Sequence, residues 1–302
     1  MDDLESRKHM GEAITTRQED AEADKAPWMK LNLDGIDTPV KELKEIRVTT
    51  EKCETETRLF YPEGEGPFPV VLQIHGGAFV GGFNAMDEPI DRQICHGAGA
   101  IVISPNYHLA PDYKWPYALE ELYALLRYFK AHAAEYDMDF SRLAVGGASA
   151  GAWYAAALCV KASREKDITF RHLNLFYPEL SVYRKGNEKW VTPYTDTVAM
   201  PPAQLDALSA TYLPEEAVDT DPLVSPIEAD ASCFPNTCIF AGTRDIFWKG
   251  AREFVGKLQD AGQEVLFKTY AESGHGFLEL AGREDLSRDA IRLLLSDLKK
   301  NL

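Results

Sequence analysis

Short apolar segments alternate with amphipathic ones along most of this chain, from about residue 45 onward. The apolar segments are nearly uninterrupted and have strand length, which suits parallel strands buried on both faces. They are PVVLQIHGG (69–77), GAIVISPNY (99–107), RLAVGG (142–147), LNLFYP (173–178), TCIFAG (237–242) and EVLFKTY (264–270). Helical patterns lie around them, near residues 87–97, 116–135, 150–165, 248–262 and 287–299. This alternation predicts an open, mostly parallel sheet with helices on both faces.

Two earlier segments, KEIRVTT (44–50) and TETRLFYP (55–62), alternate apolar and polar residues instead. Such alternation is typical of antiparallel strands with one face exposed, so we expect a hairpin at one edge of the sheet. The prediction is therefore an α/β fold with an eight-stranded sheet.

Residues 1–40 and 181–222 do not follow this rhythm. Residues 1–40 carry one apolar patch around Trp28, and 181–222 contain several large aromatic side chains, which are scarce in disordered segments. Because open α/β sheets bind ligands at the carboxyl ends of their strands, we expect both segments to form a cap over that edge. In this division 1–40 is an N-terminal cap segment, and 181–222 adds to the cap from within a catalytic domain of residues 41–302. The aromatic residues that support the cap are Trp28, Trp190, Tyr194 and Tyr212.

Charge and composition exclude several classes of partner. The formal net charge of −16 argues against nucleic acid, because binding a phosphate backbone needs a basic face, and against anionic membranes. No apolar run is long enough to span a bilayer, and the charged N-terminus lacks the apolar core of a secretory signal.

Five scattered cysteines without C-x-x-C spacing fit free thiols in a reducing cytoplasm, not a disulfide framework or a zinc site. We expect a cytoplasmic protein that acts on a small molecule without a metal or a cofactor. The sequence leaves the oligomeric state open, and a homo-oligomer is compatible with it.

The most constrained turn is GASAG (147–151), which places Ser149 between the end of a strand and an alanine-rich helical segment. A nucleophile elbow has this form, with small neighbours around an exposed serine hydroxyl. An ordinary turn serine is the alternative, and the pentapeptide alone does not decide between them.

A serine nucleophile needs a base, and the base needs an orienting group. His275, in ESGHGF, directly follows the last strand pattern and is flanked by glycines. Asp245 follows the strand TCIFAG, whereas Asp221, in DTDPLVSP, precedes it and suits a proline-linked turn. The order Ser149, Asp245, His275 is that of the α/β hydrolases.

The segment QIHGGAFVGG (73–82) follows the third strand. Its glycines allow backbone N–H groups to approach a substrate closely. Alone it is a glycine-rich turn, but beside a nucleophile elbow it predicts an oxyanion loop.

The chain resembles the hormone-sensitive-lipase-like branch of the α/β hydrolase fold esterases, whose members carry an HGGG loop. The resemblance covers residues 45–302 and implies that fold, with Ser149 as nucleophile, His275 as base and Asp245 orienting His275. It also implies that Gly77, Ala78 and Ala150 supply the oxyanion N–H groups and that His75 braces the loop. The matching pieces are HGGAF (75–79), YHLAPDYKWPYALEE (107–121), GASAG (147–151), DPLVSP (221–226), AGTRDIF (241–247) and GHGF (274–277).

Three positions depart from the family's pattern. Ala78 replaces the third glycine of the loop, and Ala148 replaces the usual aspartate before the nucleophile. After Asp245 the family's Pro-Leu-x-Asp is replaced by Ile-Phe-Trp-Lys. None of these removes a member of the triad, so they bear on substrate preference and not on reaction type.

The function we expect is that of a serine carboxylesterase, which hydrolyses small, short-chain acyl esters through an acyl-enzyme intermediate. The same triad would serve a deacetylase of acetylated sugars or an amidase. A ligand-binding receptor on the same fold is the non-enzyme alternative, and the intact Ser149, Asp245 and His275 argue against it.

Overall fold

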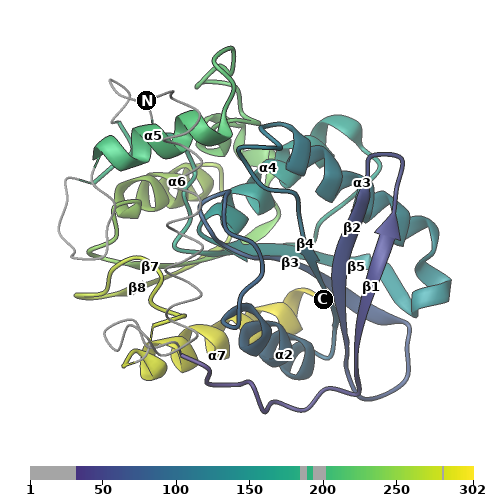
Figure 1. Cartoon of the computed structure of the whole chain (residues 1–302). Coiled ribbons are helices and arrows are strands. Elements are labelled where there is room, and N and C mark those ends of the chain that lie inside the picture. The colour runs from purple at the N-terminus through teal and green to yellow at the C-terminus, as the bar shows by residue number, and fades with distance from the viewer. Residues whose placement is uncertain (1–31, 184–188, 193–201, 281) are drawn as a thin grey trace.

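The computed structural model describes residues 32–183, 189–192, 202–280 and 282–302 (Figure 1). Its centre is one sheet. The strands are β1 (Glu42–Thr49), β2 (Glu54–Tyr61), β3 (Phe68–Ile74), β4 (Ile101–Asn106), β5 (Met138–Ala148), β6 (His172–Phe176), β7 (Asn236–Gly242) and β8 (Val265–Tyr270). Their order across the sheet is β1-β2-β4-β3-β5-β6-β7-β8. β1 and β2 pair antiparallel, β2 pairs antiparallel with β4, and the pairs from β4 to β8 are parallel. The predicted eight-stranded, mostly parallel sheet with an antiparallel edge is confirmed.

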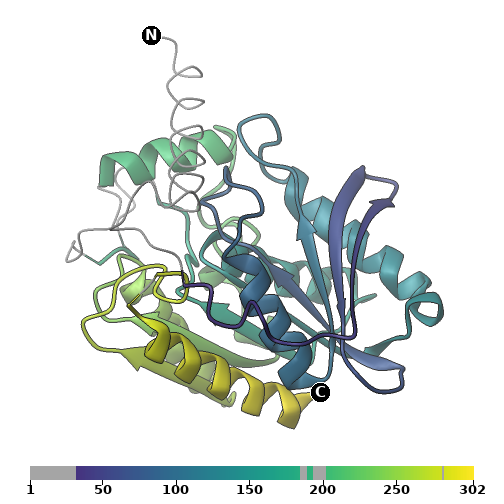
Figure 2. The same cartoon turned by 60° about the horizontal axis from the view of Figure 1, so that its bottom comes forward.

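Helices cover both faces of this sheet. The helices of the described residues are α2 (Asp87–Ala98), α3 (Tyr117–Ala131), α4 (Ala150–Glu165), α5 (Pro202–Tyr212), α6 (Trp248–Asp260) and α7 (Glu284–Asn301), with short 3₁₀ turns η2 (Ala133–Tyr136), η3 (Pro226–Glu228) and η4 (Ala231–Cys233). Figures 1 and 2 show α2 and α7 packed together on one face, and Figure 1 shows α3, α4 and α6 on the other.

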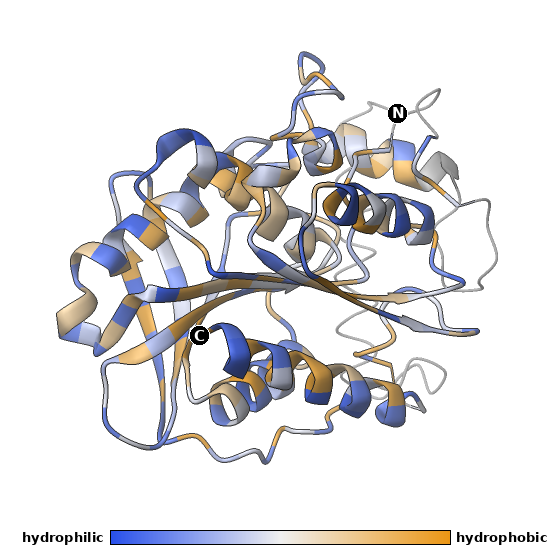
Figure 3. Cartoon of the chain, turned by 180° about the vertical axis from the view of Figure 1, so that it is seen from behind, coloured by the Kyte–Doolittle hydropathy of each residue, from blue (hydrophilic) through white to orange (hydrophobic). Residues whose placement is uncertain are grey.

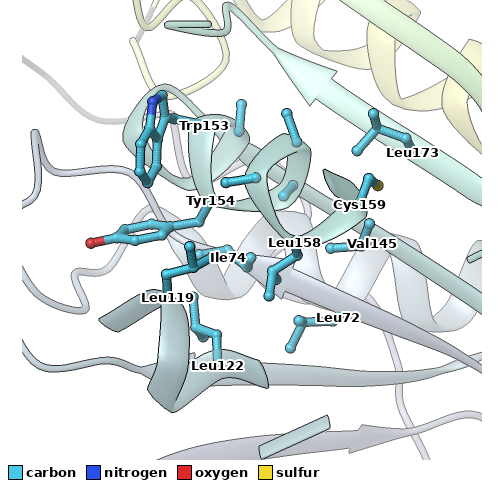
Figure 4. Packing of buried hydrophobic residues seen from close by; sticks show 14 of the residues in the cluster. Leu72, Ile74, Leu119, Leu122, Val145, Trp153, Tyr154, Leu158, Cys159 and Leu173 are labelled. Carbon is cyan, nitrogen blue, oxygen red and sulfur yellow. The ribbon is translucent and has the colours of Figure 1, made fainter. Parts of the chain in front are cut away.

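The core lies in two layers, one on each side of the sheet. On one side Leu72 and Val145 pack against Leu158 of α4 (Figure 4). On the other side Ala144 packs in the layer that includes Ile94 of α2 and residues of α7. Adjacent residues of β5 thus enter opposite layers, which explains why the central strands read as unbroken apolar runs. Figure 3 shows the same distribution, with apolar positions of the helices turned toward the sheet.

The helix α5 was not predicted. It lies in the 181–222 segment, whose sequence has aromatic residues but does not follow the strand–helix rhythm. Its first residue is Pro202, a position where proline is tolerated because the first N–H groups of a helix have no intrahelical partner. No helix in the described part of the chain combines the length and the hydrophobicity that a membrane crossing requires.

Candidate active site

Ser149 lies at the junction of β5 and α4, one residue after the strand ends and one before the helix begins. Its backbone has φ 54° and ψ −116°, a conformation that residues with a side chain rarely adopt. The junction is held on both sides, since Ser149 N–H donates to Phe176 O at 3.0 Å and Ser149 O accepts from Trp153 N–H at 3.1 Å. Strain of this kind concentrates at functional sites, where the surrounding structure enforces it.

Two glycines allow this turn to fit against β3. A Cβ added at Gly151 would lie 2.1 Å from Ile74 O, and one at Gly147 would lie 2.5 Å from the carbonyl carbon of Gly151. Because these neighbours are backbone atoms, no side-chain rotation relieves the contact. The small residues that the sequence shows around Ser149 are therefore required by packing.

The three residues expected to form the triad are joined by hydrogen bonds. His275 Nε2 lies 2.8 Å from Ser149 Oγ, and His275 Nδ1 lies 2.9 Å from Asp245 Oδ2. The Asp245 side chain is only 1% exposed, and its other oxygen accepts Phe247 N–H at 2.9 Å. With Nδ1–H donating to the carboxylate, Nε2 is left as the acceptor for the serine hydroxyl, which is the arrangement of a general base.

The electrostatics of the site favour a more basic imidazole. Burial alone would lower the pKa of His275. The charge and the hydrogen bond of Asp245 outweigh that effect, with a further contribution from Glu279, so the pKa is raised above its ordinary value of 6.5. A protonated imidazole at this position would be stabilised in the same way.

The glycine-rich loop after β3 packs directly beside the serine. A Cβ added at Gly76 would lie 3.6 Å from Ser149 Cβ, which places the two turns in contact. Gly77, Ala78 and Phe79 have positive φ angles of 120°, 54° and 66°, and Gly77 O accepts N–H groups of residues 80 and 81. The backbone N–H of Ala150, in the first turn of α4, has no intrahelical acceptor.

His75 lies under this loop and does not contact the triad. Its ring stacks on Tyr107 with centroids 4.2 Å apart, its Nδ1 lies 2.6 Å from Gly76 O, and the Tyr107 hydroxyl donates to His75 O. Burial lowers the pKa of His75 to about 4, so the ring is neutral at physiological pH. These contacts fit a residue that holds the loop in place.

The rival acid Asp221 has a different role. Its Oδ1 accepts Leu223 N–H at 3.0 Å and lies 3.5 Å from Arg164 Nη2. This is the capped turn that the proline beside it suggested.

Three residues beside His275 were missed by the sequence analysis. The Tyr177 ring meets the His275 ring edge-on at 5.1 Å, and its hydroxyl donates to Glu279 Oε1 at 2.5 Å. Burial raises the pKa of Glu279, and raises that of Glu179 to about 8. No spacing pattern marks these residues in the sequence, because only the fold brings them to the triad.

Two further groups within the described residues bring metal-ligating types together. They are Cys53, His108 and Glu121, and His172, Cys238 and Asp297. Glu121 is already satisfied, because it accepts the Thr55 hydroxyl at 2.6 Å and both the N–H and the Nδ1–H of His108 at 2.9 Å. In the second group the carboxylate of Asp297 lies 2.8 Å from His172 Nε2. The His108–Glu121 and His172–Asp297 contacts are thus explained as partly buried hydrogen bonds.

Comparison with known proteins agrees with this geometry. The model of a family described as alpha/beta hydrolase fold matches residues 71–279. The carboxylesterase NlhH of Mycobacterium tuberculosis strain H37Rv is 27% identical over 292 residues, covering 93% of this chain and 91% of the relative. An arylesterase of Saccharolobus solfataricus is 27% identical over 249 residues, covering 80% and 78%.

Among solved structures, the thermostable carboxylesterase EstE1 from a metagenomic library superposes with a TM-score of 0.84. The match covers 98% of this chain and 97% of the EstE1 chain, with 23% sequence identity. An identity this low supports a shared fold and nothing more. Since the family model spans more than half of the chain, the protein belongs to the alpha/beta hydrolase fold family, in the hormone-sensitive-lipase-like esterase branch that its motifs resemble.

Proposed function

We propose that the protein is a serine carboxylesterase that hydrolyses small, short-chain acyl esters. The observation that carries the proposal is the continuous hydrogen-bonded chain from Asp245 through His275 to Ser149, with the serine on a strained turn. The esterases among its relatives support the same reaction class.

In this mechanism Ser149 Oγ attacks the ester carbonyl while His275 Nε2 accepts its proton. Asp245 keeps Nδ1–H pointed at itself, so that Nε2 remains free to act as the base. The oxygen of the tetrahedral intermediate is bound by the backbone N–H groups of Gly77, Ala78 and Ala150. His275 then gives the proton to the leaving alcohol, and water, activated by the same nitrogen, releases the acid from Ser149.

A cap over the site would limit the size of the acyl group. We include in this cap residues 1–40 and 181–222, of which Trp28 and Tyr194 lie outside the described residues. In support, α5 contacts both catalytic loops. Tyr212 stacks on Phe79 of the glycine-rich loop with centroids 4.0 Å apart, and Leu205 packs with the two residues that follow Asp245.

Asn32, in the first cap segment, contacts residues shortly after His275. Asn32 N–H donates to Glu279 O at 2.8 Å, and the Asn32 side chain donates to Leu278 O at 2.9 Å. Asn32, the first described residue of this segment, is thus hydrogen-bonded to the loop that carries His275.

The substrate class is tested with p-nitrophenyl esters of increasing acyl length. Each methylene that fits an apolar slot contributes about 1 kcal/mol, so kcat/KM should rise to about four acyl carbons and fall beyond about eight. Tyr212→Leu should move the optimum to longer chains. Steadily rising activity with long acyl chains would identify a lipase and contradict the short-chain proposal.

A further inference from the structure

Glu179 lies beside the triad, in a segment whose backbone is fixed on both sides. The chain leaves β6 through Tyr177, whose φ is 36° and whose N–H donates to Phe240 O at 2.7 Å. After Glu179, Leu180 O accepts Ile227 N–H at 3.1 Å. The last residue of the same strand, Phe176, accepts the N–H of Ser149. The position of Glu179 is therefore set by the elements that set the nucleophile.

Glu179 is buried as a residue, but its carboxyl oxygens keep some access to solvent and have no hydrogen-bond partner among the described residues. The residue is only 5% exposed. The charged groups that act on it are His275, on the loop after β8, and Asp245, on the loop after β7. The hydroxyl of Tyr212, on α5, is also within electrostatic reach, and Glu279 faces the same imidazole from behind Tyr177. None of these is a permanent cation that would hold Glu179 as a carboxylate.

Glu279 provides a comparison within the same site. It is more exposed than Glu179, and its Oε1 accepts the hydroxyl of Tyr177. Glu279 is thus satisfied inside the protein, whereas Glu179 is not. An unpaired buried polar group is costly, and such groups usually find a partner in a ligand or in water.

Burial makes Glu179 a neutral acid at physiological pH, since its pKa is raised to about 8. A neutral carboxyl group carries one O–H donor. Its neutrality also matters for the triad, because a carboxylate at this place would raise the pKa of His275 further and weaken the supply of the unprotonated base.

We propose that Glu179 is a specificity-determining residue that donates a hydrogen bond to an acceptor oxygen carried by the substrate close to the scissile ester bond. The preferred substrates are then oxygenated esters, with an ether, hydroxyl or second carbonyl oxygen next to the ester group. This inference rests on the proposed esterase function and defines its substrate class.

Two isosteric pairs of esters test the proposal. On the acyl side, p-nitrophenyl methoxyacetate is compared with p-nitrophenyl butyrate. On the alcohol side, 2-methoxyethyl butyrate is compared with n-butyl butyrate. Each pair differs by one ether oxygen in place of a methylene, and the ratio of the two kcat/KM values is measured for wild type, Glu179→Gln and Glu179→Met. Intrinsic differences in ester reactivity cancel when the same ratio is compared between variants.

Glu179→Met should lower the ratio by about tenfold or more in one of the pairs, since a site built for a hydrogen bond discriminates strongly and an apolar isostere does not. That pair shows whether the acceptor belongs to the acyl or the alcohol part. Glu179→Gln, which keeps a neutral donor, should preserve most of the ratio. In wild type the ratio should fall as the pH rises through about 8, because the donor proton is lost, and in Glu179→Gln it should stay flat.

An unchanged ratio in both pairs for Glu179→Met would overturn the proposal. A wild-type ratio that grows as the pH rises through 8 would overturn it too, because the side chain would then act as a carboxylate. If Glu179→Met does not fold, the pH dependence of wild type against Glu179→Gln still decides. Failure of the proposed function is a separate result, namely a wild type that hydrolyses no ester of either pair, or butyrate turnover that survives Ser149→Ala and so excludes Ser149 as the nucleophile.

Discussion

Substituting Gly151 by alanine tests whether the serine turn is packed as described. The new Cβ would lie 2.1 Å from Ile74 O, 2.5 Å from His75 O and 2.7 Å from the carbonyl carbon of Ile74. All three atoms belong to the backbone at the end of β3 and the start of the glycine-rich loop, so the two turns must separate by roughly 1 Å to reach ordinary contact distances.

Overpacking a dense core costs about 1–3 kcal/mol, and rigid backbone neighbours place this case at the upper end. The better helix propensity of alanine returns at most about 1 kcal/mol. A net loss of about 2 kcal/mol corresponds to a fall in Tm of roughly 4–8 °C. Because a displacement near 1 Å separates Ser149 from the oxyanion donors, kcat should fall by about 100-fold.

Gly256→Ala is the matched control. Gly256 lies within α6, and a Cβ there meets nothing within 4 Å, so this variant should keep the Tm and kcat of wild type or gain slightly in Tm. Thermal unfolding followed by circular dichroism and turnover of p-nitrophenyl acetate are measured for both variants. If Gly151→Ala melts like the control and keeps its kcat, the close approach of the serine turn to β3 is wrong.

Two further predictions concern the groups around His275. Asp245→Asn should lower kcat by about 10⁴-fold because the imidazole loses its orienting acceptor, while Asp221→Asn should change Tm and leave kcat near wild type. Parallel assays with the opposite result would exchange the roles of the two acids. The base works only when neutral and its pKa is raised, so kcat/KM for p-nitrophenyl butyrate should be lost as the pH falls, with a midpoint above 6.5. A midpoint below 6.5 in the pH profile would show that burial outweighs the charge of Asp245.

The sheet could be predicted because burial of both its faces requires uninterrupted apolar runs in the sequence. Val71 and Leu72 enter different core layers, so every position of such a strand must be apolar. The turn at Ser149 could also be predicted from the sequence, because the close contacts of Gly147 and Gly151 require glycine on either side of the serine.

The helix α5 and the two glutamates beside His275 could not be predicted. Two prolines open the α5 segment, and its residues show no clear apolar stripe, so no local pattern marks it as a helix. Glu179 and Glu279 are single carboxyl groups in otherwise apolar stretches. Their significance comes from their place beside His275, where the segments that follow β6 and β8 come together at one edge of the sheet.

Covalent labelling of Ser149 tests the central claim most directly. The protein is incubated with diethyl p-nitrophenyl phosphate, a reagent that phosphorylates activated serines, and its intact mass and peptide masses are compared with those of Ser149→Ala. The account predicts that wild type gains one diethylphosphoryl group, on the peptide that contains Ser149, and loses its esterase activity in the same proportion. Ser149→Ala should stay unlabelled and inactive. A label on another residue, or esterase activity that persists in Ser149→Ala, would contradict the assignment of Ser149 as the nucleophile.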